Sequence, residues 1–180
     1  MSHPSTSGRA GFTLIEALVA MMVLTVGLLG LAQSFYVGMR HMSTSSANLV
    51  AREKAREAVE SVHTARDTRT ITWDQIKNVS NGGVFLDGAQ SLQNAGDDGL
   101  INTADDAAAG IETVRAPGPN GLFGDVDDVL TPLAGFTRRI QIIELSPVDP
   151  DLRELRVTIT YQVGAQSGSY ALRTYVSAFS

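Results

Sequence analysis

The sequence of 180 residues predicts an α+β fold in which one long N-terminal helix packs on an antiparallel β-meander. Three observations support this prediction. Residues 12–37 contain no Lys, Arg, Asp or Pro and are long enough to cross a membrane as a helix. Residues 38–69 continue without Pro and keep apolar residues at helical spacing. From residue 136 onward, apolar and polar residues alternate as they do in strands.

The N-terminal apolar segment differs from a cleaved secretory signal. Such a signal has an apolar core of roughly 7–15 residues followed by a small-residue cleavage site. Here the candidate site, between Gly11 and Phe12, precedes the apolar run, so cleavage would leave the anchor on the product. Arg9 on the leader favours a cytoplasmic N-terminus, since positive residues beside a membrane segment tend to stay inside. We therefore expect the remainder of the chain to lie outside.

Glu16 is the single formal charge in this apolar segment. A carboxylate within a membrane helix costs about 2.5–3.5 kcal/mol on insertion scales, so it usually has a partner or a function. Cleavage after Gly11 would place the new α-amino group of Phe12 one helical turn from Glu16, or near Glu16 of a neighbouring copy. The opposite charge would then compensate the carboxylate.

The run G-F-T-L-I-E from Gly11 to Glu16, followed by a long apolar helix, resembles the class III signal of type IV pilins and type II secretion pseudopilins. The resemblance implies a type IV pilin-like fold, cleavage between Gly11 and Phe12 by a prepilin peptidase, and N-methylation of Phe12. It also implies pairing of Glu16 with the N-terminus of a neighbouring subunit. The continuation G-L-L-G-L-A at 27–32 is most similar to the PilV type of minor pilin. Gln33 stands where the family often has Pro, so a kink there is not implied.

The helix should continue beyond the membrane as an amphipathic extension. The run S-T-S-S at 43–46 is its weakest part, because these residues hydrogen-bond their own backbone, but we expect no break there. Small apolar residues at three- and four-residue steps share one face of this extension: Ala47, Val50, Ala51, Ala55, Ala58, Val59 and Val62.

An acidic loop region follows and contains an internal repeat at an offset of 22 residues. Residues 98–106 align without gaps to residues 120–128, each copy reading Asx-Gly-Leu and closing with Asp-Asp. Ca²⁺ takes six to eight oxygen ligands, which such Gly-containing turns can bring together, and calcium loops occur in some members of the resembling family. The alternative is a pair of solvated Asx turns. The candidate ligands are Asp98, Asp105, Asp106, Asn120, Asp125, Asp127 and Asp128.

The C-terminal third predicts three strands, at 136–145, 152–163 and 170–178, connected by 146–151 and 164–168. The predicted organisation is a leader (1–11), a transmembrane or filament-core helix (12–39), an amphipathic extension (40–69), a loop region with calcium candidates (70–135) and an antiparallel sheet (136–180).

The amino-acid composition excludes several classes of function. There is no cysteine, so disulfides and thiolate metal sites are excluded, and the net charge of −5 argues against direct nucleic-acid binding. No enzyme motif is present, so we expect a non-enzyme with no required cofactor.

The preferred function is a minor pilin that enters, or primes assembly of, a type IV pilus serving adhesion, twitching or DNA uptake. The alternatives are a minor pseudopilin of a type II secretion system and a solitary anchored adhesion domain, which would not need Glu16. Expected partners are the prepilin peptidase, the major pilin, other minor pilins and the inner-membrane assembly platform. The chain should reside in the inner membrane before assembly and in an extracellular pilus or periplasmic filament afterwards.

Overall fold

The computed structural model describes residues 13–145 and 149–179, and the chain divides into two units, Met1–Met42 and Ser43–Ser180. Helix α1 (Leu14–Asp67) contributes to both. Its stretch Leu14–Met39 is 26 residues long, apolar enough to cross a membrane, and exposed in the isolated chain. The expected N-terminal apolar helix is therefore confirmed.

The part of α1 that belongs to the second unit buries a row of small side chains. Ala51, Ala55 and Ala58 are fully buried, and Ala47 and Ala65 nearly so. The helix runs through residues 43–46 without interruption. The helical periodicity thus marks the face that joins the core.

A Schellman motif ends α1. The amide of Thr70 donates to the carbonyl of Ala65 at 3.0 Å, and the amide of Arg69 donates to Arg66 at 3.1 Å. Arg69 takes φ +57°, the left-handed position that usually carries glycine. The chain therefore turns out of the helix directly after Asp67.

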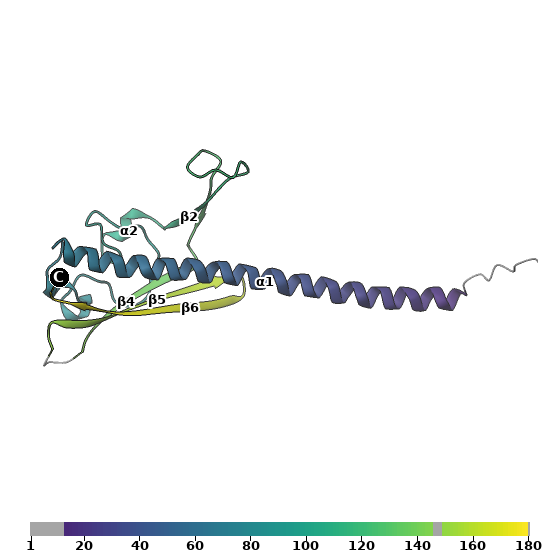
Figure 1. The fold of residues 1–180 in the computed structure, drawn as a ribbon, viewed down its shortest axis with the longest axis horizontal. Helices are drawn as coiled ribbons and strands as arrows, with labels where there is room; N and C mark the ends of the chain where they lie inside the picture. The colour runs from purple at the N-terminus through teal and green to yellow at the C-terminus, as the bar shows by residue number, and fades with distance from the viewer. Residues whose placement is uncertain (1–12, 146–148, 180) are drawn as a thin grey trace, which may run out of the picture. The chain divides into compact units, whose positions relative to one another are not determined.

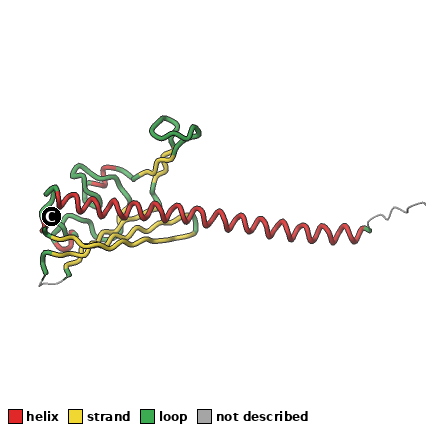
Figure 2. The backbone as a smooth tube through the Cα atoms, in the orientation of Figure 1, coloured by secondary structure: helices red, strands yellow, loops and turns green. Residues whose placement is uncertain are grey.

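The main sheet has four antiparallel strands in the order β1-β4-β5-β6. Strands β4 (Phe136–Glu144), β5 (Leu152–Val163) and β6 (Gln166–Ser177) form the predicted meander, and β1 (Gln90–Ser91) pairs with Arg138 and Thr137 at the outer edge of β4. The α+β architecture with a long N-terminal helix and an antiparallel sheet is confirmed (Figures 1 and 2).

Strand β6 starts earlier than the sequence predicted. Val163 pairs with Gln166, so Gly164 and Ala165 alone form the turn, with Gly164 at φ +59°. Gly168, which we expected in the connection, lies within the strand, where a Cβ would overlap the ring of Tyr161. Here glycine makes room for an aromatic side chain on the neighbouring strand rather than ending the strand.

Shorter elements connect α1 to β4. They are two 3₁₀ turns (Trp73–Gln75 and Val79–Asn81), β1, the single-turn α2 (Asp106–Ala109), and β2 (Thr113–Ala116), which pairs with β3 (Val129–Pro132). In the second unit, the main sheet lies on one side of α1, and α2 with the β2–β3 pair lies on the other (Figure 1).

The hydrophobic core lies entirely within the second unit. Its buried apolar members begin at Ala47 and end at Val176, and the largest fully buried ones include Phe85, Ile76 and Leu92. The second unit therefore has a complete core of its own and meets the structural requirement for a domain that folds independently.

Candidate functional site

The start of α1 carries Glu16 in a capping position. The amide of Glu16 donates to the carbonyl of Thr13 at 3.1 Å and approaches its hydroxyl oxygen at 3.4 Å. Thr13 and Glu16 stand three residues apart, as in a Thr-x-x-Glu capping box, and a carboxylate in the first turn also suits the helix dipole. Both bonds come from the backbone amide of Glu16, and its carboxylate is placed in the first turn of the helix.

The two processing residues, Gly11 and Phe12, lie outside the described residues. Their roles stay predictions from the sequence. Glu16 is described, is exposed in the single chain, and lies in the first turn of the apolar helix.

The internal repeat predicted in the acidic region is also a repeat of structure. Two eleven-residue segments, which we name loop 1 (residues 96–106) and loop 2 (residues 118–128), have matching hydrogen bonds. Gly99 donates its amide to Gly96 at 3.1 Å in loop 1, and Gly121 donates to Gly118 at 3.0 Å in loop 2. The same backbone turn therefore opens both loops.

The matching continues through the side chains at the start of each turn. The amide of Leu100 donates to Asp98 Oδ1 at 2.8 Å, and the amide of Leu122 donates to Asn120 Oδ1 at 2.7 Å. These are Asx turns, and the glycine after each Asx residue has positive φ, +70° and +73° respectively.

The close of each loop also corresponds. Asn102 donates its amide to Asp106 Oδ2 at 2.6 Å, and Gly124 donates to Asp128 Oδ2 at 2.7 Å. Both donors take left-handed φ, +69° and +93°. The final aspartate of each copy thus binds the backbone of a turn four residues earlier.

Each loop brings three carboxylates together. Oxygens of Asp98, Asp105 and Asp106 lie within 4.8 Å of one another, as do oxygens of Asp125, Asp127 and Asp128. The structure therefore gathers the predicted residues into two clusters, one in each loop.

In loop 1, hydrogen bonds from the protein already occupy these carboxylates. Asp106 is buried and accepts from the amides of Gly96, Asn102 and Thr103 and from the Thr103 hydroxyl. Burial raises the pKa of Asp106, while the backbone donors oppose that change. Asp105 accepts from the Thr103 hydroxyl at 2.7 Å, which lowers the pKa of Asp105, with the Asp98 amide adding to the effect.

In loop 2, the carboxylates have fewer donors. Asn120 Nδ2 donates to Asp125 at 2.6 Å and to Asp127 at 3.0 Å, so its amide group lies between two acids. A hydrogen bond with Asp127 and then the Asn120 amide lower the pKa of Asp125. Asp128 Oδ2 lies 3.5 Å from Arg115, and its side chain is 3% exposed. Its Oδ1 is buried without a hydrogen-bond partner.

The loops differ in the burial of the two apolar residues that follow the first glycine-containing turn. Leu100 and Ile101 of loop 1 are each 4% exposed and join the core, whereas Leu122 and Phe123 of loop 2 are 64% and 70% exposed. Val126 of loop 2 is also fully exposed. The same motif is thus internal in one copy and external in the other.

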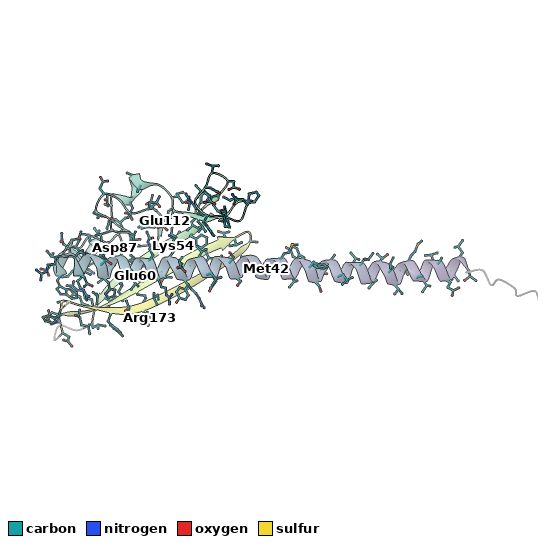
Figure 3. All side chains as sticks on the ribbon, turned by 45° about the horizontal axis from the view of Figure 1, so that its top comes forward. Met42, Lys54, Glu60, Asp87, Glu112 and Arg173 are labelled. Atoms are coloured by element: carbon teal, nitrogen blue, oxygen red, sulfur yellow. The ribbon has the colours of Figure 1, made fainter. Side chains whose placement is uncertain are left out.

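A buried charge cluster that the sequence analysis missed holds this region to α1. Glu112 is 3% exposed and lies 2.7 Å from Lys54 Nζ (Figure 3). It also lies 3.0 Å from Arg138 Nη1. Burial lowers the pKa of Lys54, but its bonds to Glu112 and Glu57 outweigh that, so the pKa is raised. Arg138 shares the alternating face of Phe136 and Ile140, which was the available signal for a buried arginine with a partner.

A second buried arginine, Arg153 on β5, binds the 3₁₀ turn Trp73–Gln75. Arg153 lies over the ring of Trp73, with its guanidinium carbon 4.0 Å from the ring centroid. It also donates to the carbonyls of Trp73 and Ile76, the latter at 3.0 Å. Burial lowers the pKa of Arg153, and Glu144 and Asp74 oppose that effect.

Comparison with known proteins gives one match. Residues 6–32 match the family described as the prokaryotic N-terminal methylation motif, a segment that contains Gly11, Phe12 and Glu16. No curated protein and no solved structure matches the chain. The apolar helix and this motif fit inner-membrane anchoring, and the motif implies processing by a prepilin peptidase. The N-terminal segment is therefore a type IV pilin signal, which supports membership of the pilin and pseudopilin superfamily.

Proposed function

We propose that the chain is a minor pilin that enters, or primes assembly of, a type IV pilus. The observation that carries the proposal is the methylation motif at residues 6–32, continued by the unbroken apolar helix Leu14–Met39. The alternative is a minor pseudopilin of a type II secretion system, which would use the same segment.

In this proposal the peptidase cuts between Gly11 and Phe12, and the new amino group of Phe12 is methylated. The α-amino nitrogen stays cationic after methylation, so it can pair with Glu16 of a neighbouring subunit. Lipid already solvates the apolar helix, so moving that helix from lipid into a filament gains less free energy than moving it from water. The pairing of Glu16 then supplies register as well as binding energy.

The Thr-x-x-Glu spacing of Thr13 and Glu16 dictates the experiment. Glu16→Gln keeps a residue that can complete a capping box with Thr13 but removes the charge, whereas Glu16→Ala removes both. Charge pairing predicts that both variants are cleaved and inserted but are depleted at least tenfold from sheared filaments. Thr13→Ala is the matched control, since it weakens the cap and leaves the charge.

Two outcomes would reject this role of Glu16. Normal incorporation of Glu16→Gln, with loss only in Glu16→Ala and Thr13→Ala, would assign Glu16 to helix capping alone. Normal incorporation of every variant would leave it without a role in assembly. A mature-sized product from Gly11→Ser would separately contradict the assigned cleavage site.

The choice between pilus and secretion system needs a different measurement. Deletion of the gene should reduce surface pili and twitching and leave exoprotein secretion intact. Loss of secretion with normal piliation would favour the pseudopilin alternative.

We also propose that loop 2 binds a calcium ion. The supporting observation is Asp128 Oδ1, a buried carboxylate oxygen without a partner beside Asp125 and Asp127. An ion there would compete with the Asn120 amide, which now lies between the two other acids. Loop 1 is the weaker candidate because its carboxylates already accept several hydrogen bonds.

Calorimetric titration of the Ser43–Ser180 unit with CaCl₂ tests this site. Binding should stabilise the folded state by mass action and raise Tm, and Asp128→Asn should abolish the binding. Asp105→Asn in loop 1 is the matched control and should leave the binding intact. Absence of heat and of any Tm shift at millimolar calcium would leave both loops as Asx turns.

A further inference from the structure

We propose that the tip of loop 2 docks on the outer face of the β4-β5-β6 sheet of a second copy of this chain. The tip consists of Leu122, Phe123, Asp125 and Val126, all exposed. The proposal goes beyond the filament role above, because it places two copies of this chain side by side, whereas that role requires only other pilins as neighbours.

The internal repeat indicates that the apolar pair of the tip has a binding role. In loop 1 the equivalent pair, Leu100 and Ile101, is almost fully buried in the core. The matching backbone hydrogen bonds hold loop 2 in the same turn, so Leu122 and Phe123 are presented by an ordered backbone. A pair of this size exposed on a short loop is typical of an interaction site rather than of solvated surface.

The charge of the tip selects the kind of surface that could receive it. Asp125 is exposed and Asp127 is partly so, whereas the side chain of Asp128 is only 3% exposed and lies beside Arg115. The tip therefore combines apolar side chains with accessible carboxylates. A complementary surface needs cations around an exposed apolar side chain.

The outer face of the main sheet has these properties. Arg139 of β4 is exposed, the side chains of Arg156 and Arg173 are 29% and 66% exposed, and Tyr175 on the same face is 59% exposed. The carboxylate among these side chains is Glu154, which bonds Arg156 at 2.9 Å and lies 3.8 Å from Arg173. Three arginines against one glutamate leave an excess of positive charge in a chain of net charge −5.

The cross-strand register makes this face a receptor for an anion. Arg156 and Arg173 are directly opposite each other on β5 and β6. Like charges directly opposite each other destabilise a sheet, and one shared carboxylate offsets this only in part. A carboxylate from a docked tip would complete the compensation, which adds an ionic attraction to the burial of Phe123. Because Asp125 is also a proposed calcium ligand, the docked state is that of the ion-free loop.

The placement of the two surfaces requires two molecules. Within the second unit, the β2–β3 pair that carries loop 2 lies on the side of α1 opposite the main sheet (Figures 1 and 2). A tip therefore cannot reach the sheet of its own chain and must bind that of another copy. Such a contact joins different surfaces of the two partners, and heterologous contacts of this kind generate rings or open filaments.

The absence of native cysteine permits a direct test by disulfide trapping in the full-length chain. Two epitope-tagged copies, one with Phe123→Cys and the other with Tyr175→Cys, are co-expressed, and membranes and sheared filaments are oxidised separately. We expect a mixed dimer from this pair and no dimer from the matched control pair, Phe123→Cys with Glu60→Cys. Trapping in membranes without filament entry would support the contact while rejecting the filament role.

A second test exchanges the charges of Asp125 and Arg173 between the two copies. Asp125→Arg or Arg173→Glu in the copies should each reduce the trapped fraction at least fivefold, and combining them should restore it. The proposal is overturned if Phe123→Cys pairs only with itself, crosslinks only to a different protein, reacts only with a lipid-soluble probe, or yields no dimer. It is equally overturned if the charge exchange gives no rescue.

Discussion

Lys54 on α1 and Glu112, which directly precedes β2, form an ion pair at 2.7 Å, and Arg138 on β4 binds the other oxygen of the same carboxylate at 3.0 Å. Three separate parts of the second unit thus meet at one buried acid. Lys54 also reaches Glu57 at 2.6 Å, which carries the cluster toward solvent.

Removing the central acid should destabilise the domain strongly. Glu112→Gln removes the ion-pair partner of the buried Arg138 and leaves Lys54 with Glu57 alone, and breaking a buried pair in this way costs about 3–5 kcal/mol. Urea unfolding of the Ser43–Ser180 unit measures the effect. Glu57→Gln, at the exposed end of the cluster, is the control and should change little; equal effects of the two changes would contradict a buried cluster.

Arg153→Lys should destabilise the domain although it keeps the charge. Lysine loses the planar stack on Trp73 and cannot donate to two carbonyls in the same geometry, so we expect a loss of about 1–3 kcal/mol. Trp73 is the single tryptophan of the chain, so its fluorescence reports both the loss of stacking and the unfolding transition. Arg156→Lys on the outer face serves as control. An unchanged emission spectrum in Arg153→Lys would show that the stack is absent in solution.

Gly96→Ala should destabilise loop 1. A Cβ at this position would overlap the side chain and backbone of Asp105, which must then move away from Thr103 and Asp98. We expect a cost of about 1–3 kcal/mol, typical of overpacking. Gly118→Ala makes the equivalent overlap with Asp127 in the exposed loop 2, so it should affect thermal unfolding less. The reverse order of the two effects would contradict the burial assigned to the loops.

His63 should make the domain less stable below neutral pH. Burial, and then the nearby Arg66, lower the pKa of His63 from 6.5, while Asp67 opposes this. The folded state therefore favours neutral imidazole, so the contribution is full above pH 6.5 and declines as pH falls through 6.5 toward the lower folded value. His63 is the single histidine after residue 43, so Tm of the Ser43–Ser180 unit between pH 7.5 and 5.5 isolates it. His63→Gln should flatten this slope; an unchanged slope would assign it to other groups.

The sequence was most informative where residue patterns repeat. The alternation of residues 152–163 predicted β5 with the bounds that the structure has, and the helical spacing of small residues marked the buried face of α1. These patterns arise because burial on one face imposes a period of 2 on strands and 3.6 on helices.

Pairings between distant residues could not be read in this way. The short strands β1, β2 and β3 depend on partners far along the chain and carry little periodicity of their own. The turn that begins at Gly164 was predicted too long because Gly168 reads locally as a turn residue, whereas its role depends on Tyr161 across the hairpin. The burial of Glu112 likewise depends on Lys54 and Arg138, which no local pattern connects.

The sequence predicted which residues form the two acidic clusters, but not how the two clusters differ. The 22-residue repeat identified both acidic clusters, and the structure brings their members together. The carboxylates of loop 1 accept more hydrogen bonds from the protein than those of loop 2. This difference depends on Thr103, Gly96 and the core contacts of Leu100. Those interactions require the tertiary structure.

Asn78 makes the β4 side of the main sheet different from its β6 edge. Its buried side chain donates to the carbonyl of Ile140 at 2.8 Å and accepts from the amide of Ile142 at 2.8 Å, so one amide satisfies β4 beyond the two residues that β1 covers. Among the described strands, β6 has a neighbour on one flank alone. One edge of the main sheet is therefore closed by side-chain hydrogen bonds to β4, whereas no described strand covers the outer flank of β6 at the other edge.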